Sequence, residues 1–342
     1  MQMKEKMLFT FIGAICLLLA FAILPSTDVS AQQTPAPKTK APIKLSLVTF
    51  QPTGAIKTKM FLEVIRRINE RAKGELVIEV KGGPEVVAGL DQPKAVQKGI
   101  IDMALTATTY YKSLVPEAYL VLFSRITSKR EREVGFYELL LDLHKKNGLF
   151  YFGRAEAVDV PSFSIVSTKR VKAPSEMAKH RLGISGPHIK AFPESLGMSL
   201  LLIPLPDAYT SLERGLVDFY STPWHTHVSF KLQEVCKYVI DHSYLAPNSV
   251  LIANLSAWEK VPKHLQDLVR NTYFEVTDEQ IPEYTKLLEN SRQVMRNAGV
   301  EFVKFSQADA QGFIETLYKT EIESHLKELP QHGPKLMELL RK

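Results

Sequence analysis

PLPDAYTSLERGLVDFYSTPW, residues Pro204 to Trp224, decides how this chain is organised. The stretch predicts a short helix, a stop at Gly215 and a brief buried strand over 216–220. Pro206 suits the first turn of a helix, where its missing N–H is not needed. A glycine after the helix takes positive φ without the penalty of a Cβ. The polar residues 221–223 then predict that the strand ends in a loop.

The chain contains a second copy of this unit. Residues 95–104 read AVQKGIIDMA, and residues 211–220 read SLERGLVDFY. Both follow the order small, apolar, polar, basic, glycine, two branched apolar residues, aspartate, apolar. The matching pairs are Gly99 with Gly215 and Asp102 with Asp218. Two such units more than a hundred residues apart indicate two lobes of related build.

Loops rich in threonine and aromatic residues follow both units, at 106–111 and 221–224. Ligands of open α/β sheets bind beyond the carboxyl ends of the strands. Two lobes that present such loops to each other would form a cleft. Strands and helices alternate along the rest of the chain, which predicts the α/β class throughout.

Length and composition narrow the protein class. The 342 residues allow two domains, and 45% hydrophobic with 23% charged residues is ordinary for a globular protein. The net charge is +6, but no Lys/Arg block alternates with aromatic residues, so a nucleic-acid partner is not expected.

The N-terminus predicts export. Lys4 and Lys6 precede an apolar run over 7–24, and Val29-Ser30-Ala31 offers small residues for a signal peptidase. Residues 1–31 therefore read as a signal peptide, followed by a disordered, proline-rich linker at 32–42. The alternative is a retained membrane anchor, since the run nearly reaches spanning length.

Domain limits follow from the order of elements. Residues 43–160 are expected to form lobe I, completed by part of 245–342, and 161–244 to form lobe II, with the C-terminal helices packing across both. Residues 130–147 predict one amphipathic helix. Cys236 is expected in a buried strand, and after cleavage it has no cysteine with which to form an internal disulfide.

The sequence lacks the common catalytic patterns. It has no Gly-x-Ser-x-Gly, His-Glu-x-x-His, Cys-x-x-Cys or Gly-x-Gly-x-x-Gly after a strand. His225 and His227 could share one face of a strand, but no third metal ligand is nearby in the sequence. We therefore expect neither an enzyme nor a metal or other cofactor.

The order of these features resembles the solute-binding proteins of tripartite ATP-independent periplasmic (TRAP) transporters, over about residues 43–330. The matching pieces are GELVIEVKGGPEV, AVQKGIIDMAL, VKAPSEMAKHRLGIS and PLPDAYTSLERGLVDFYSTP. The resemblance implies a two-lobed periplasmic-binding-protein fold with hinge-crossing segments. It also implies a periplasmic protein that captures a small-molecule solute by lobe closure and delivers it to TRAP membrane permease subunits. We expect this protein to act as a monomer.

The family's carboxylate-binding arginines do not carry over. Gly183 stands where the family pattern has its arginine, and Pro161 and Ser162 stand at the place of the other frequent arginine. Thr222 replaces the family's asparagine. The usual bidentate carboxylate clamp is therefore not where the pattern puts it.

Two hypotheses follow for the ligand. Arg154 or Arg181 could supply the positive charge, because Arg181 shares a strand face with Gly183. Alternatively, the ligand is not a simple dicarboxylate: glycine in place of arginine opens volume, and aromatic residues near the expected cleft favour a bulkier, partly aromatic or apolar solute, such as a monocarboxylate. The candidate ligand-binding residues are Phe50, Tyr110, Tyr111, Arg154, Glu156, Arg181, Ser185, Tyr220, Thr222 and Trp224.

Two other functions stay open at the level of the sequence. One is an exported enzyme that reuses this fold, and turnover of a trapped ligand would distinguish it. The other is a binding protein that serves a sensor or a different permease. The sequence does not name the solute.

Overall fold

The structure, a computed structural model, describes residues 41–341. The predicted signal peptide (1–31) and nearly all of the predicted linker (32–42) lie outside the described residues. Within 41–341, no helix combines the length and the apolar character that a membrane crossing requires.

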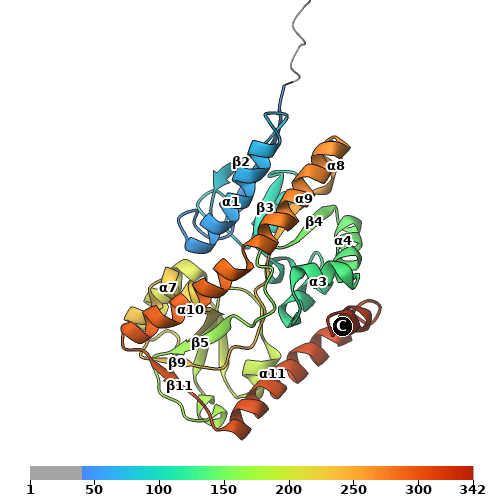
Figure 1. Ribbon diagram of the computed structural model, residues 1–342. Coiled ribbons are helices and arrows are strands. Elements are labelled where there is room, and N and C mark those ends of the chain that lie inside the picture. Colours follow the sequence, from blue (N-terminus) through green and yellow to red (C-terminus); the bar gives the residue numbers. More distant parts are fainter. Residues whose placement is uncertain (1–40, 342) are drawn as a thin grey trace, which may run out of the picture. The chain divides into compact units, whose positions relative to one another are not determined.

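Two β-sheets organise the described chain, which confirms the predicted α/β class (Figure 1). The first sheet has the order β2-β1-β3-β10-β4. Its strands are β1 (Ile43–Thr49), β2 (Leu76–Gly82), β3 (Met103–Ala107), β4 (Leu149–Arg154) and β10 (Ser249–Asn254). The second sheet has the order β11-β9-β5-β8-β6-β7. Its strands are β5 (Phe163–Ser167), β6 (Arg181–Ile184), β7 (Ser199–Leu202), β8 (Phe219–Pro223), β9 (Tyr238–Ile240) and β11 (Glu301–Val303).

Helices cover both sheets, and the C-terminal helices reach both. Helix α9 packs on α1, α10 packs on α7, α11 packs on α5 and α12 packs on α4 (Figure 1). The α-helices are α1 (Ile56–Arg71), α2 (Gln92–Gln97), α3 (Ser128–Glu133), α4 (Phe136–Lys146), α5 (Ala191–Ser195), α6 (Ala208–Glu213), α7 (Trp224–Ser229), α8 (Leu255–Glu259), α9 (Lys263–Glu279), α10 (Ile281–Asn297), α11 (Gln307–Glu328) and α12 (Gly333–Leu339). Short 3-10 turns η1 (Thr108–Tyr111), η2 (Pro116–Phe123), η3 (Pro174–Met177), η4 (Leu205–Asp207) and η5 (Leu232–Glu234) lie in the connections.

The strand directions bring the loops of each lobe to one edge. In the first sheet, β1 is parallel to β2 and β3, while β10 runs antiparallel to both β3 and β4. The carboxyl ends of β1, β3 and β4 therefore meet the start of β10. In the second sheet, β6 and β8 are parallel and β5 runs antiparallel to β8, so the ends of β6 and β8 meet the start of β5.

The two repeated units form the same turn. Gly99 has φ +70° and Gly215 has φ +67°, the left-handed region that glycine reaches without strain. After each turn, an aspartate holds the neighbouring parallel strand: the Asp102 carboxylate accepts from the Ser46 N–H at 2.8 Å, and the Asp218 carboxylate accepts from the Arg181 N–H at 3.2 Å. The aspartates thus fix where β3 and β8 sit beside β1 and β6.

The strands of both units begin later than the sequence predicts. The strands expected over 100–105 and 216–220 are β3 and β8, which begin at Met103 and Phe219, because the turn still holds the residues after each glycine. β8 then runs to Pro223, so residues 221–223 continue the strand and do not form the predicted loop. The Leu216 N–H donates to the Ser211 carbonyl at 2.8 Å, and the Ile100 N–H donates to the Ala95 carbonyl at 2.9 Å. Hydrophobicity alone does not separate these turn residues from the strand that follows.

Two further sequence predictions differ from the structure. The single helix predicted over 130–147 is two helices, α3 and α4, separated at Gly135, whose φ of +82° ends the helical path. Cys236 precedes β9 instead of lying in it, but its thiol is fully buried as expected. Burial raises the pKa of this thiol to about 12, which keeps it protonated and unreactive.

Candidate functional site

A cavity lies between the facing edges of the two sheets, and we call it the central cavity. The first lobe contributes the residues after β1 and β3 and before β10, and the second lobe those after β6 and β8. The lining residues are Phe50, Gln51, Lys57, Ala107, Thr109, Tyr110, Phe163, Ser185, His188, Leu205, Thr222, Pro223, His225, Thr226, Pro247, Asn248 and Ser249. Its volume is about 30 Å³, which is room for only two or so water molecules, so a solute must widen it by lobe opening or side-chain movement.

The two lobes touch directly beside this cavity. The Tyr110 ring of the first lobe lies over the backbone of Gly186 in the second, so closely that a Cβ at Gly186 would stand 2.5 Å from the ring. Tyr110 also meets Phe50 edge to face, with ring centroids 5.6 Å apart. Burial raises the pKa of Tyr110 to about 12, so its hydroxyl stays protonated and able to donate a hydrogen bond.

Lys57 is the one lysine or arginine among the residues that line the central cavity. It stands in the first turn of α1, directly after the loop that follows β1. Its side chain is only 7% exposed, and its ammonium contacts the Ser249 hydroxyl and the Glu156 carboxylate. The ammonium also lies 5.3 Å from the centre of the Phe50 ring. A buried cation beside an aromatic wall is suited to bind an anionic group.

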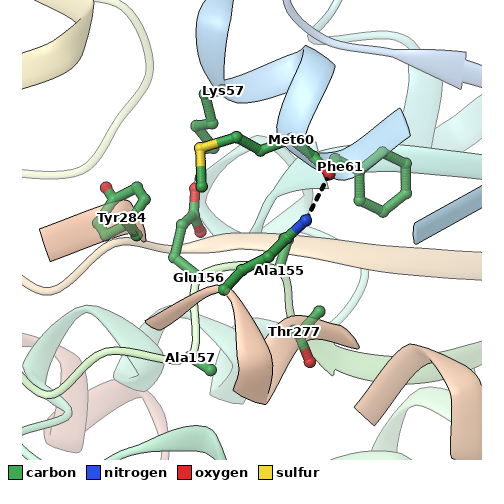
Figure 2. A pocket seen from close by; sticks show the side chains of 9 residues that line it. Lys57, Met60, Phe61, Ala155, Glu156, Ala157, Thr277 and Tyr284 are labelled. Atoms are coloured by element: carbon green, nitrogen blue, oxygen red, sulfur yellow. Dashed lines mark hydrogen bonds and ion pairs between the residues drawn. The ribbon is translucent and has the colours of Figure 1, made fainter. Parts of the chain in front are cut away.

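A second, smaller cavity of about 20 Å³ lies on the other side of Lys57. We call it the side cavity. It is lined by Lys57, Met60, Phe61, Ala155, Glu156, Ala157, Thr277, Gln280 and Tyr284. Figure 2 shows the Glu156 side chain in this cavity, pointing toward Lys57. Lys57 lines both cavities, whereas Glu156 lines only the side cavity.

Buried histidines complete the polar lining on the second lobe. His188 bonds the Ser221 hydroxyl at 3.0 Å, and burial lowers its pKa to about 4. The pKa of His225 is held well below its ordinary value by burial, and the positive charge of Lys57 lowers it further. The Nε2 atom of His225 and the Thr226 hydroxyl are buried and have no hydrogen-bond partner among the described residues. They are therefore free to bind a polar solute.

His225 and His227 do not share a strand face, because both lie on α7. Residues two apart on a helix point to different sides. His227 bonds the Ser164 hydroxyl at 2.9 Å inside the second lobe. In the part of the chain that the structure describes, no cluster of three or more metal-ligating side chains occurs.

Five of the ten candidate site residues lie at these cavities. Phe50, Tyr110, Ser185 and Thr222 line the central cavity, and Glu156 lines the side cavity. Four of them follow the end of a strand by at most three residues, and Thr222 lies near the end of β8.

Arg154 lies in the core of the first lobe, away from the central cavity. Its side chain is 0% exposed, and its guanidinium is 3.0 Å from the Glu131 carboxylate. It also donates to the carbonyls of Val158 at 2.9 Å and Ile126 at 2.6 Å. These bonds join the end of β4 to the segment before α3, so the structure gives Arg154 a supporting place in the fold.

Arg181 lies at the amino end of β6, the opposite end from the cavity. Its side chain is 44% exposed and donates to the Gly215 carbonyl at 2.7 Å. The expected alternation with Gly183 therefore does not bring this guanidinium to the solute.

Gly183 does not open volume, contrary to the sequence analysis. A Cβ at Gly183 would stand 2.6 Å from the ring of Tyr220, because that ring fills the space. Tyr220 is fully buried and donates to the Ile203 carbonyl at 2.8 Å. The space that the missing arginine would have left is thus filled by the core of the second lobe.

Tyr111 and Trp224 also pack away from the central cavity. The Tyr111 hydroxyl bonds His144 at 3.0 Å within the first lobe. Trp224 stacks on Phe302 at 5.7 Å, and its indole N–H donates to the Ser243 hydroxyl at 2.8 Å. Both side chains are buried structural residues in this conformation.

Lys57, His188, His225 and Asn248 line the central cavity but were not among the predicted ligand-binding residues. Lys57 resembles any lysine on an amphipathic helix, although its place just after the loop that follows the first strand was a usable signal. His188 and Asn248 lie in loops whose position depends on the sheet order. That order brings residues from distant parts of the sequence together, and local patterns do not reveal it.

Comparison with known proteins identifies the family of this chain. Residues 47–324 match the family described as bacterial extracellular solute-binding protein, family 7 (DctP). A monocarboxylate 2-oxoacid-binding periplasmic protein of Nostoc is 22% identical over 71% of this chain and 69% of its own length. A solute-binding protein of Albidiferax ferrireducens is 23% identical over 64% and 68%.

Solved structures share the fold. A TRAP periplasmic solute-binding protein of Desulfovibrio salexigens with bound orotic acid has a TM-score of 0.78 at 18% identity, covering 87% of this chain and 97% of that one. An extracytoplasmic solute receptor of Bordetella pertussis that binds pyroglutamic acid has a TM-score of 0.77 at 16% identity, covering 87% and 99%. The two-lobed fold and the resemblance found in the sequence are confirmed: the chain belongs to the DctP family, the bacterial extracellular solute-binding proteins of family 7.

Proposed function

We propose that this protein is the periplasmic solute-binding subunit of a TRAP-type transporter, and that it captures a small organic acid in the central cavity. The observation that carries this proposal is the buried ammonium of Lys57, which lines a cavity between the two lobes. The bound carboxylate contacts Lys57, while Asn248, His225 and Thr226 supply hydrogen bonds. The monomer then delivers the solute to the membrane permease subunits and does not transform it.

The relatives support an acid as the solute class. One is named for monocarboxylate 2-oxoacids, and fold neighbours hold orotic and pyroglutamic acid. This chain differs in that its two candidate arginines are bonded elsewhere, so Lys57 takes their place as the cation.

Mass spectrometry of the solute released from protein purified under mild conditions tests this proposal. An unmodified organic acid that rebinds reversibly to stripped protein is the expected result. A released compound that differs from the added one would indicate turnover and overturn it, as would failure of any organic acid to bind.

Lys57→Met tests the proposed anchor. We expect at least tenfold weaker binding of the released acid, measured by calorimetry, because a methionine cannot pair with a carboxylate. Lys59→Met, on the exposed face of the same helix, is the matched control and should bind as the unaltered protein does. Equal affinities of both variants would remove Lys57 from the site.

A further inference from the structure

The ion pair of Lys57 and Glu156 makes the site electrically neutral. Their side chains are 7% and 3% exposed, and the ammonium contacts the carboxylate directly. Apart from histidines, they are the one cation and the one anion that line the central and side cavities. Charges that are so deeply buried interact strongly, since little water is present to screen them.

The histidines add no positive charge near neutral pH. Burial lowers the pKa of His188 to about 4, and it holds that of His225 well below its ordinary value. The formal charges at the two cavities therefore sum to zero.

The arrangement is also directional. Lys57 lies between the two cavities, and Glu156 lies behind it, on the side away from the central cavity. Neither carboxylate oxygen of Glu156 has a hydrogen-bond donor among the described residues besides its ion pair with Lys57. A solute in the central cavity can thus contact the Lys57 ammonium. The Glu156 carboxylate behind it repels any negative charge on the solute, because no other described donor neutralises this carboxylate.

One bound carboxylate can share Lys57, but a second has no cation to meet. Arg154 is bonded to Glu131, and Arg181 lies at the far end of β6. A buried charge without a partner is strongly unfavourable. The rings of Phe50, Tyr110 and Phe163 also line the central cavity and suit an apolar or aromatic body.

We propose that Glu156 is a specificity-determining residue: by balancing Lys57 from behind, it restricts the site to organic acids with a single carboxylate and an apolar body, and excludes dicarboxylates. This inference rests on the proposed function, since it assumes that an acid binds at Lys57.

Pairs of a monocarboxylate and a dicarboxylate of similar shape test whether the site excludes a second carboxylate. Calorimetry on the stripped protein would compare butanoate with succinate, and benzoate with terephthalate. We expect the monocarboxylate of each pair to bind at least tenfold more tightly. Equal or tighter binding of the dicarboxylate would overturn the inference and leave the proposed function standing, whereas binding of neither acid, with no acid released from the native protein, would overturn the proposed function itself.

Glu156→Gln tests the residue. It keeps the shape of the side chain and removes its charge, so the site gains one positive charge. We expect dicarboxylate affinity to rise at least tenfold and the ratio of the two affinities to fall toward one. Glu156→Asp keeps the charge and should restore the original ratio. A ratio that is unchanged in Glu156→Gln, with an unfolding midpoint close to that of the unaltered protein, would overturn the assignment.

Two further variants serve as controls, one for the buried charge pair and one for the overall charge of the protein. Lys57→Met with Glu156→Gln removes both charges together, and it should bind neither acid while it stays folded. Glu63→Gln removes a carboxylate from the exposed face of α1, where Glu63 pairs with Arg66, and should leave the ratio unchanged. A shifted ratio in Glu63→Gln would attribute the selection to overall charge and overturn the role of Glu156.

Discussion

The unit over 95–104 and the unit over 211–220 share one backbone conformation but place different side chains after it. Each ends a short helix at a glycine with positive φ, and each places an aspartate on the neighbouring strand. Beyond the aspartate their tyrosines diverge: β3 leads to Tyr110 at the central cavity, whereas Tyr220 of β8 packs into the core of the second lobe and β8 reaches the cavity with Thr222. The backbone turn is thus shared, and the side chains after it determine which residue of each unit reaches the cavity and which packs in the lobe core.

Substitution of the two tyrosines should show this difference most strongly. Tyr220→Ala removes a fully buried ring and its hydrogen bond to Ile203, so we expect a loss of about 3–5 kcal/mol in the free energy of unfolding. Tyr110→Ala should lose less stability, because Tyr110 is half-buried, but it should weaken solute binding. Urea unfolding and calorimetry measure the two effects. Equal stability losses would contradict the assigned roles.

Lowering the pH should destabilise the second lobe more than the first. His188 and His227 have pKa values lowered by burial to about 4 and about 3. The unfolded chain binds their protons below pH 6.5 while the folded chain does not, so stability falls as the pH drops. Each histidine then costs about 2 kcal/mol at pH 5.

Hydrogen exchange at pH 7 and pH 5 locates this loss. The first lobe contains one comparable histidine, His144, with its pKa lowered to about 4, and the second lobe also contains His225. Amides of β5 and β8 should therefore lose more protection than those of β1 and β3. Uniform loss over both sheets would show that the histidines do not distinguish the lobes.

Gly183 tests how tightly the second unit is packed. Gly183→Ala would place a methyl group 2.6 Å from the Tyr220 ring, and overpacking of this kind costs about 1–3 kcal/mol. Gly312→Ala is the control, because its added Cβ meets nothing within 4 Å on α11, and it should be neutral or slightly stabilising. Similar midpoints for both variants would mean that Tyr220 moves aside freely.

The two aspartates should give the smallest effects and the closest agreement. Asp102→Asn and Asp218→Asn keep the shape of the side chain but weaken the bond to the neighbouring strand, and each should cost about 1 kcal/mol. Thermal unfolding measures both. A loss confined to one unit would show that the shared turn is held by different forces in the two lobes.

Local patterns were enough for the fold but not for every boundary. The repeat and the alternation of strands and helices could be predicted because their signals lie within short stretches. The starts of β3 and β8 could not, since hydrogen bonds within each turn delay the strand. The break at Gly135 likewise depends on backbone geometry that hydrophobic spacing does not report.

Site residues near the ends of strands could be predicted from the sequence. The positions of charged residues could not, because they depend on ion pairs with distant segments. Phe50, Tyr110, Ser185 and Thr222 line the central cavity because loops after parallel strands converge. Arg154 looked equally well placed, but its partner Glu131 stands on a different element. Whether a charged residue faces a solute or another side chain is decided by contacts between distant segments.

The position of β10 also constrains the order in which this protein can fold. β10 lies between β3 and β4 in the first sheet, although every strand of the second sheet except β11 precedes it in the chain. As the chain emerges from its N-terminus, the first sheet therefore lacks an inner strand until Asn254 is present, and β3 and β4 have no partner on their facing edges. Such a chain cannot complete its first lobe early, and its open strand edges need protection from other chains until β10 is in place.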